Sequence, residues 1–163
     1  MAFRYSPKVV TDGLIFAVDA ANKKSYPGSG TNWKDVVSNN NGTLTNGPTF
    51  NSGNAGTIDF DDTNDYITFG NTSTLNFEWN DPHSIEVWLK RSNSGNSYIV
   101  GKNESSGNYR GTEFTFSGDN KVFYIIRNTN STSNRIYSIT TNTYNDGEWH
   151  QFVVTYDGSG TAG

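Results

Sequence analysis

The chain contains no cysteine and no long apolar run among its 163 residues. Without cysteine it can form neither disulfides nor thiolate metal sites, so its stability cannot depend on redox state. No stretch approaches the roughly 18 consecutive apolar residues that a membrane-spanning helix requires. Residues 1–8 also lack the apolar centre of a secretion signal. We therefore expect synthesis in a cytoplasm and no membrane partner.

A concentration of positive charge is also missing. The chain carries 12 Lys and Arg against 16 Asp and Glu, a formal net charge of -4, and its basic residues are scattered singly. No basic stripe is available to neutralise a phosphate backbone, so we expect no nucleic-acid partner. Only 33% of the residues are hydrophobic, whereas Asn, Thr, Ser and Gly make up nearly half of the chain. This composition favours short, half-buried strands joined by polar turns over long amphipathic helices.

Alternation of apolar and polar residues predicts strands along the second half of the chain. In residues 84–90, Ile85, Val87 and Leu89 fall on one face. Residues 149–156 alternate in the same way, with Phe152 and Val154 directed inward. We expect Ile85, Val87, Phe152 and Val154 to lie in one core. Further strands are predicted at 98–101, 113–116, 122–127 and 135–139, with a turn at 117–120.

The first half of the chain is harder to assign. Residues 13–19 alternate and predict a first strand, whereas 22–54 are rich in Asn, Gly, Ser and Pro. We interpret 22–54 as a surface excursion with one short strand at 43–45. Residues 57–60 and 65–69 are short alternating runs separated by the turn formers at 61–64, which predicts a hairpin.

Many short strands without helical periodicity predict an all-β fold, an antiparallel β-sandwich of the jelly-roll type. A closed barrel stays an alternative, although irregular loop lengths favour the sandwich. One domain is predicted over 11–163, preceded by an arm at 1–10 that either docks on a neighbouring subunit or frays. Asp157-Gly158 predicts a turn into a partner strand that the sequence does not contain. We therefore expect a sandwich that lacks its closing strands at the C-terminus, with a longer polypeptide or another subunit supplying them.

Five segments in this order resemble the concanavalin A-like, laminin G-like jelly rolls, over nearly the whole chain. They are 12–22 DGLIFAVDAAN, 25–33 SYPGSGTNW, 60–66 FDDTNDY, 84–89 SIEVWL and 149–158 WHQFVVTYDG. The likeness is greatest to the versions found in structural proteins of tailed bacteriophages. It implies a concanavalin A-like jelly roll on a capsid exterior or a tail fibre.

Catalytic patterns are missing from the strands. Glycan-cleaving enzymes with this fold resemble one another in a Glu-x-Asp-x-x-Glu strand, which places an acid and a nucleophile on one face. No such spacing occurs here. His83 and His150 have no serine and carboxylate arranged as a triad would need, and His150 is better interpreted as a hydrogen-bonding strand residue. We expect no enzymatic activity.

Aromatic residues suggest a sugar-stacking platform, because a flat ring meets the apolar side of a pyranose. The plainer interpretation is that they cover the core, and for Trp88 we favour burial. Residues 103–110 form a better exposed candidate. The predicted ligand-binding residues are Trp88, Glu104, Asn108, Tyr109 and Arg110.

An acidic cluster surrounds the predicted hairpin turn. Ca²⁺ takes six to eight oxygen ligands, which carboxylates and carbonyls supply. Asp and Asn also tolerate the backbone angles of a turn, and we favour that interpretation. The candidate metal ligands are Asp59, Asp61, Asp62, Asn64 and Asp65.

The leading hypothesis is a non-enzymatic surface protein of a phage virion, in capsid decoration or a tail fibre, with weak glycan adhesion. It would assemble with other virion subunits or as a homo-oligomer in the host cytoplasm, and act on cell-surface glycans outside. The alternative is a carbohydrate-binding module of a larger secreted enzyme. A free-standing glycan hydrolase would need two carboxylates roughly 5 to 9.5 Å apart.

Overall fold

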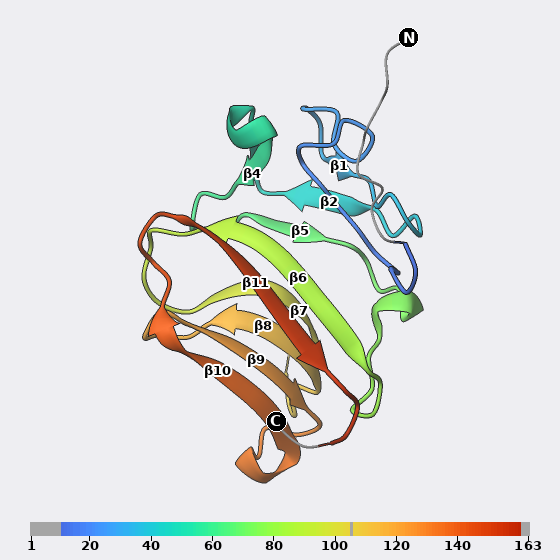
Figure 1. Cartoon of the computed structure of the whole chain (residues 1–163), viewed down its shortest axis with the longest axis vertical. Coiled ribbons are helices and arrows are strands. Elements are labelled where there is room, and N and C mark those ends of the chain that lie inside the picture. The colour runs from blue at the N-terminus through green and yellow to red at the C-terminus, as the bar shows by residue number, and fades with distance from the viewer. Residues whose placement is uncertain (1–10, 105, 161–163) are drawn as a thin grey trace. The chain divides into compact units, whose positions relative to one another are not determined.

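The computed structural model describes residues 11–104 and 106–160 (Figure 1). These residues form two compact units, which meet in the sequence between Leu75 and Asn76. The predicted N-terminal arm at 1–10 lies outside the described residues, and the single domain over 11–163 stays a prediction. None of the short helical turns in the described part has the length or the apolarity that crossing a bilayer requires.

The first unit contains two small antiparallel sheets. The larger has the strand order β1-β2-β5, with β1 at Asn32–Trp33, β2 at Gly42–Thr45 and β5 at Tyr66–Thr68. The smaller pairs β3, Thr49–Asn51, with β4, Thr57–Asp59. Two single-turn 3₁₀ helices, η1 at Gly53–Ala55 and η2 at Ser73–Leu75, follow β3 and β5. The short strand predicted at 43–45 is confirmed as β2.

The surface excursion predicted over 22–54 is wrong. Ser25, Tyr26, Asp35 and Leu44 are all buried, and β1 and β3 lie in this segment in addition to β2. The physical reason is that hydrogen bonds of polar side chains, instead of contacts between apolar ones, hold this segment together. The Ser25 hydroxyl donates to the Lys34 carbonyl at 2.6 Å and accepts from the Asp19 amide at 3.0 Å.

The strand predicted at 13–19 is also wrong, because no strand forms there. Its backbone groups form hydrogen bonds with the Asp35 side chain and the Val36 backbone instead of with a neighbouring strand. The Ala17 amide donates to Asp35 Oδ1 at 3.0 Å, and the Ala17 carbonyl accepts from the Val36 amide at 3.0 Å. Alternation alone does not reveal that a side chain will take the place of a ladder partner.

The hairpin predicted at 57–69 is wrong in its pairing. Strands β4 and β5 both exist, but β4 pairs with β3 and β5 pairs with β2. The residues between them form a turn closed by side chains, in which the Asp61 amide donates to Asp65 Oδ2 at 3.0 Å. The two runs therefore separate into different sheets.

The second unit contains a two-stranded and a four-stranded antiparallel sheet. Strand β6, His83–Lys90, pairs along its whole length with β11, Trp149–Tyr156. The other sheet has the order β10-β9-β8-β7 and is joined partly by the predicted turn at 117–120. Its strands are β7 at Ser97–Asn103, β8 at Gly111–Phe116, β9 at Lys121–Arg127 and β10 at Arg135–Thr143, with the 3₁₀ helix η3 at Thr132–Asn134 before β10. All the strands predicted between 84 and 156 are confirmed.

The core of the second unit lies between its two sheets, and the β6–β11 pair crosses over the four-stranded sheet in Figure 1. Phe152 is buried in this core, and Ile85, Val87, Leu89 and Val154 pack against it, as the alternation predicted. The remaining buried members come from β8 and β9 and are Phe114, Phe116, Val122, Tyr124 and Ile126. The predicted all-β antiparallel sandwich is confirmed, and no closed barrel forms in the part of the chain that the structure describes.

Candidate functional site

The face of the four-stranded sheet that turns away from the core carries an unusual set of side chains. On β8, Phe114 and Phe116 point into the core, so Glu113 points to the opposite face. The ladders align Glu113 with Ile125 on β9 and with Gly101 on β7. We call this surface the Arg127 face, after the residue that pairs with Glu113.

A charged network lies within the Arg127 face. The Glu113 carboxylate is only 5% exposed, forms an ion pair with the Arg127 guanidinium and accepts from the Asn103 amide nitrogen at 2.8 Å. A buried carboxylate is costly unless its oxygens are paired and hydrogen-bonded, and both conditions hold here. The network therefore fixes the Arg127 side chain in place on the sheet.

Aromatic rings flank this network. Tyr98 on β7 is 67% exposed and Tyr137 on β10 is 46% exposed. The Tyr98 ring lies 3.4 Å from the position that a Gly101 Cβ would occupy, so the glycine lets the ring lie along the sheet. The Tyr137 ring lies 5.5 Å from the Phe123 ring, centroid to centroid. These aromatic side chains give the Arg127 face flat apolar surfaces on both sides of its charged centre.

Two arginines on this face keep buried donors free. The Nε atoms of Arg127 and Arg135 are buried, and neither has a hydrogen-bond partner among the described residues. The Arg135 guanidinium lies 5.1 Å above the Tyr137 ring and the Arg127 guanidinium 5.8 Å from the Tyr109 ring. Buried donors without partners are rare in folded proteins, because each costs about 1 to 3 kcal/mol.

The predicted loop site lies at the end of the Arg127 face, in the β7–β8 connection. The Glu104 amide donates to the Arg110 carbonyl at 2.9 Å and closes the loop. All four predicted loop residues, Glu104, Asn108, Tyr109 and Arg110, are exposed. Gly111 ends the loop with φ of 137°, and a Cβ there would lie 2.1 Å from the Lys102 carbonyl oxygen. Only glycine fits at this position.

The structure does not place Trp88 with this loop. Trp88 lies on β6 between the inward-facing Val87 and Leu89, so it points out of the two-stranded sheet, and it is 59% exposed. The expectation that Trp88 is buried is wrong, because its side chain points away from the core of the second unit. The loop belongs to the other sheet of the sandwich, on the far side of the core.

Sequence reasoning missed Asn103, Glu113 and Arg127 as a group. Glu113 and Arg127 lie in runs of alternating residues. Their side chains are therefore expected on the face opposite to those of Phe114 and Ile126. Their proximity depends on the register between β8 and β9, which pairs Glu113 with Ile125 and Gly111 with Arg127. The alternation could have indicated the face, but not the pairing.

The predicted calcium ligands form a turn. Asp61 Oδ1 accepts from the Thr63 amide at 2.9 Å and the Asn64 amide at 3.3 Å. The Thr63 amide holds the pKa of the Asp61 carboxyl below its ordinary value. Asp59 accepts from Asn51 and Thr57, and Asp62 has φ of 61°. In residues 11–104 and 106–160, no three acidic or histidine side chains gather closely enough to hold a metal ion, so calcium binding stays a prediction.

His150 is a hydrogen-bonded strand residue. Its Nε2 atom lies 3.0 Å from Asp146 Oδ1, and its ring packs on Tyr144. The other histidine, His83, begins β6 and bonds through Nε2 to the Tyr124 hydroxyl in the core. Burial raises the pKa of that Tyr124 hydroxyl well above its ordinary value. Both histidines therefore have structural partners.

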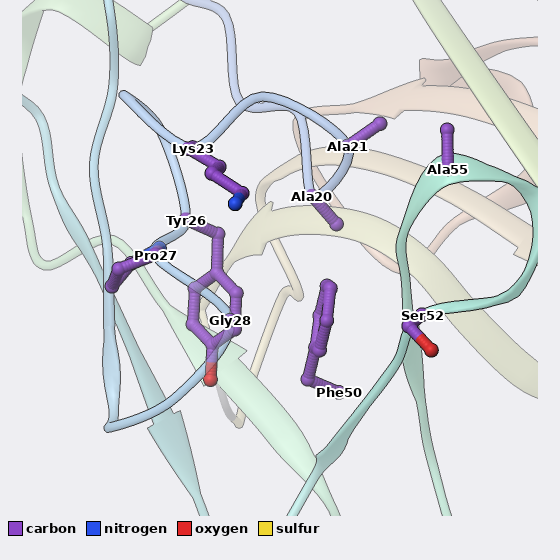
Figure 2. Close-up of a pocket in the computed structure, with 9 residues that line it drawn as sticks. All are labelled: Ala20, Ala21, Lys23, Tyr26, Pro27, Gly28, Phe50, Ser52 and Ala55. Carbon is purple, nitrogen blue, oxygen red and sulfur yellow. The ribbon is translucent and has the colours of Figure 1, made fainter.

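A cavity of about 300 Å³ lies in the first unit (Figure 2). It is bounded by the loop at 20–28 on one side and by β3 and η1 on the other. Its aromatic walls are Tyr26 and Phe50, with ring centroids 5.6 Å apart. The remaining lining residues are Ala20, Ala21, Lys23, Pro27, Gly28, Ser52 and Ala55. Sequence reasoning did not identify this cavity.

Residues 61–162 match a laminin G family model that is described as the concanavalin A-like lectin/glucanases superfamily. The match covers more than half of the chain and includes every strand from β5 to β11. The Arg127 face lies within the matched residues, whereas the residues lining the cavity precede them. No curated protein and no solved structure is similar enough to the chain to count as a match.

Proposed function

The chain belongs to the concanavalin A-like lectin/glucanases superfamily, and from this premise we propose that it is a non-enzymatic carbohydrate-binding protein. The Arg127 face binds the glycan. Sugar rings stack on the exposed Tyr98 and Tyr137 side chains, and their hydroxyls bond to the charged groups between them. Tyr109 and its neighbours in the 104–110 loop form the end of the site.

The observation that carries this proposal is the combination of exposed rings with a fixed polar centre. Binding is favoured when the groups that contact the ligand are already held in place, since less conformational entropy is lost. Glu113 and Asn103 hold Arg127 in this way. The unpartnered Nε atoms of Arg127 and Arg135 are donors that sugar hydroxyls can satisfy, directly or through water.

The carboxylates support a binding function over catalysis. Glycoside hydrolysis uses an acid and a second carboxylate about 5 to 9.5 Å apart around the scissile bond. Only two carboxylates among the described residues are buried, Asp35 and Glu113, and they belong to different units. Glu113 is already engaged by Arg127 and Asn103, and its neighbours on the adjacent strands, Ile125 and Gly101, are not acids.

We further propose that the protein is exposed on a phage virion, in capsid decoration or a tail fibre. The resemblance of its segments to such proteins supports this placement, and adhesion to cell-surface glycans would be the role of the Arg127 face. Gold-labelled antibodies against the chain should decorate purified particles. If these antibodies label a secreted enzyme and no particles, the alternative is favoured, namely a carbohydrate-binding module of a larger secreted enzyme.

Replacing Tyr98 or Tyr109 with alanine is expected to weaken glycan binding about tenfold, because each loses a stacking surface worth roughly 1.4 kcal/mol. Hits from a glycan array would be titrated by calorimetry against the wild type and each variant. Trp88→Ala is the matched control, since Trp88 is also an exposed aromatic residue, at 59% against 67% for Tyr98, but lies on the other sheet.

Equal loss in Trp88→Ala and Tyr98→Ala would contradict the assignment of the Arg127 face. If both tyrosine variants bind glycan normally and their circular dichroism spectra show an intact fold, the Arg127 face is not the binding site. Repeating the titration with a chelator tests the predicted calcium ligands separately, because none of them belongs to the second unit.

A further inference from the structure

We propose that the cavity of the first unit is a second binding site, for a small molecule that consists of one ring and a carboxylate. This proposal does not depend on glycan binding at the Arg127 face. Figure 2 shows the Tyr26 and Phe50 rings facing the space between the 20–28 loop and η1, with the Lys23 side chain above them.

The walls of the cavity are held in place before any ligand binds. The Tyr26 hydroxyl donates to the Gly30 carbonyl at 2.6 Å, and the Tyr26 amide donates to the Asn22 carbonyl at 2.8 Å. On the other side, a Cβ at Gly56 would lie 2.7 Å from the Ala20 carbonyl oxygen, so the two walls approach as closely as glycine permits. A pre-formed pocket loses little entropy on binding.

The backbone beside the cavity is in an uncommon conformation. Asn54 and Ala55 have φ of 52° and 69°, and Ala55 lines the cavity. Alanine rarely adopts positive φ, and such residues cluster at ligand-binding sites. The turn brings Ser52 and Ala55 to the same wall, next to Phe50.

The chemistry of the lining selects the ligand. Lys23 is the one charged side chain that lines the cavity, and no described carboxylate forms an ion pair with it. Ser52 adds a hydroxyl, while the rings and alanine methyls provide an apolar surface. An anion with a flat apolar body satisfies both parts, because its carboxylate meets the ammonium and its ring meets Phe50.

The size of the cavity suits a small ligand built on one ring. A volume of about 300 Å³ is at the lower end for ligand pockets. An aromatic acid and a sugar acid share the required chemistry, a ring that bears a carboxylate. Benzoate and glucuronate are therefore the two probes, each paired with a neutral analogue, benzamide and methyl glucoside.

The full chain would be titrated with the four probes while backbone amide shifts are recorded by NMR. We expect at least one carboxylate to shift the amides of 20–28 and 50–56, and its neutral analogue to bind about tenfold or more weakly, since a charge-assisted hydrogen bond is lost. Which acid binds distinguishes an aromatic from a sugar ligand.

Lys23→Gln should weaken binding of that carboxylate about tenfold, whereas Lys24→Gln, one residue away and outside the lining, should not. Ala20→Leu should block the cavity, because the Ala20 methyl points into it in Figure 2. No shifts with either acid, equal binding of the neutral analogues, or equal effects of the two lysine variants would each overturn the proposal.

Discussion

Replacing Asp35 with alanine is expected to lower the free energy of unfolding of the first unit by about 3 to 5 kcal/mol, because several buried hydrogen bonds are lost at once. The Asp35 carboxylate is 1% exposed. It accepts hydrogen bonds from the backbone amides of Ala17, Val37, Ser38 and Asn40 and from the Ser38 hydroxyl, at 2.6 to 3.1 Å. Alanine leaves these donors unpaired.

Chemical denaturation combined with amide exchange would measure this effect, since amide exchange reports the opening of each part of the chain separately. We expect the Ala17 and Val37 amides to lose protection first. Asp35→Asn keeps the shape and one acceptor oxygen, so it should cost less than alanine. Asp12→Ala is the control, because Asp12 is exposed and should change stability by less than about 0.5 kcal/mol. Similar stability of the Asp35 and Asp12 variants would refute this account.

Asp35 also makes the first unit sensitive to acid. Burial raises the pKa of the carboxyl, but the Ser38 hydroxyl and the amides of Ala17, Val37 and Asn40 together lower it below the ordinary 3.8. A carboxyl with a depressed folded pKa stabilises the fold above its unfolded pKa, and this stability is lost as the pH falls through the folded value. Unfolding should therefore become easier below about pH 4, and less so in Asp35→Ala.

The contrast between the two units explains how much of the fold could be predicted. In the second unit the strands of the two-stranded sheet obey a period of two, as β6 shows with Ile85, Val87 and Leu89 on one face. Apolar alternation is a local property, so it can be seen in the sequence. The register that closes the sandwich follows from burying those faces against each other.

The first unit could not be predicted in this way, since polar side chains organise it. Asp35 bonds to Ala17, which is 18 residues away, and Ser25 bonds to Asp19 and Lys34. In a Gly- and Asn-rich segment, the sequence does not distinguish a buried aspartate or serine from a solvated one. The surface excursion at 22–54 and the strand at 13–19 are wrong for this reason, whereas the hairpin is wrong because its two strands pair with β3 and β2.

The candidate site likewise has one part that could be predicted from the sequence and one part that could not. The loop candidate at 103–110, which includes Tyr109, could be recognised from its composition, whereas the positions of Tyr98 and Tyr137 on the same face could not. The network beneath them depends on three strands meeting in register, β7, β8 and β9. Residues 10 to 14 positions apart in the sequence become neighbours only through that pairing, as Asn103 and Glu113 do.

Replacing Glu113 with alanine is expected to destabilise the second unit by about 3 to 5 kcal/mol, since the Arg127 charge is left buried without its partner. The midpoint of thermal unfolding should fall by about 10 °C for a chain of this size. Lys121 and Asp119 form an ion pair at 3.4 Å where the turn between β8 and β9 meets the same sheet, which makes Asp119→Ala the matched control. That variant should destabilise the second unit far less, because solvent screens an exposed ion pair.

A double variant separates stability from binding. Glu113→Leu with Arg127→Leu removes both charges, and replacing a buried ion pair with apolar side chains of similar volume is often neutral or stabilising. We expect the double variant to recover most of the stability lost in Glu113→Ala and yet to bind glycan at least tenfold more weakly, since the Arg127 donors are gone. A double variant that binds normally would mean that the ion pair serves only the sheet, and that the tyrosines alone account for recognition.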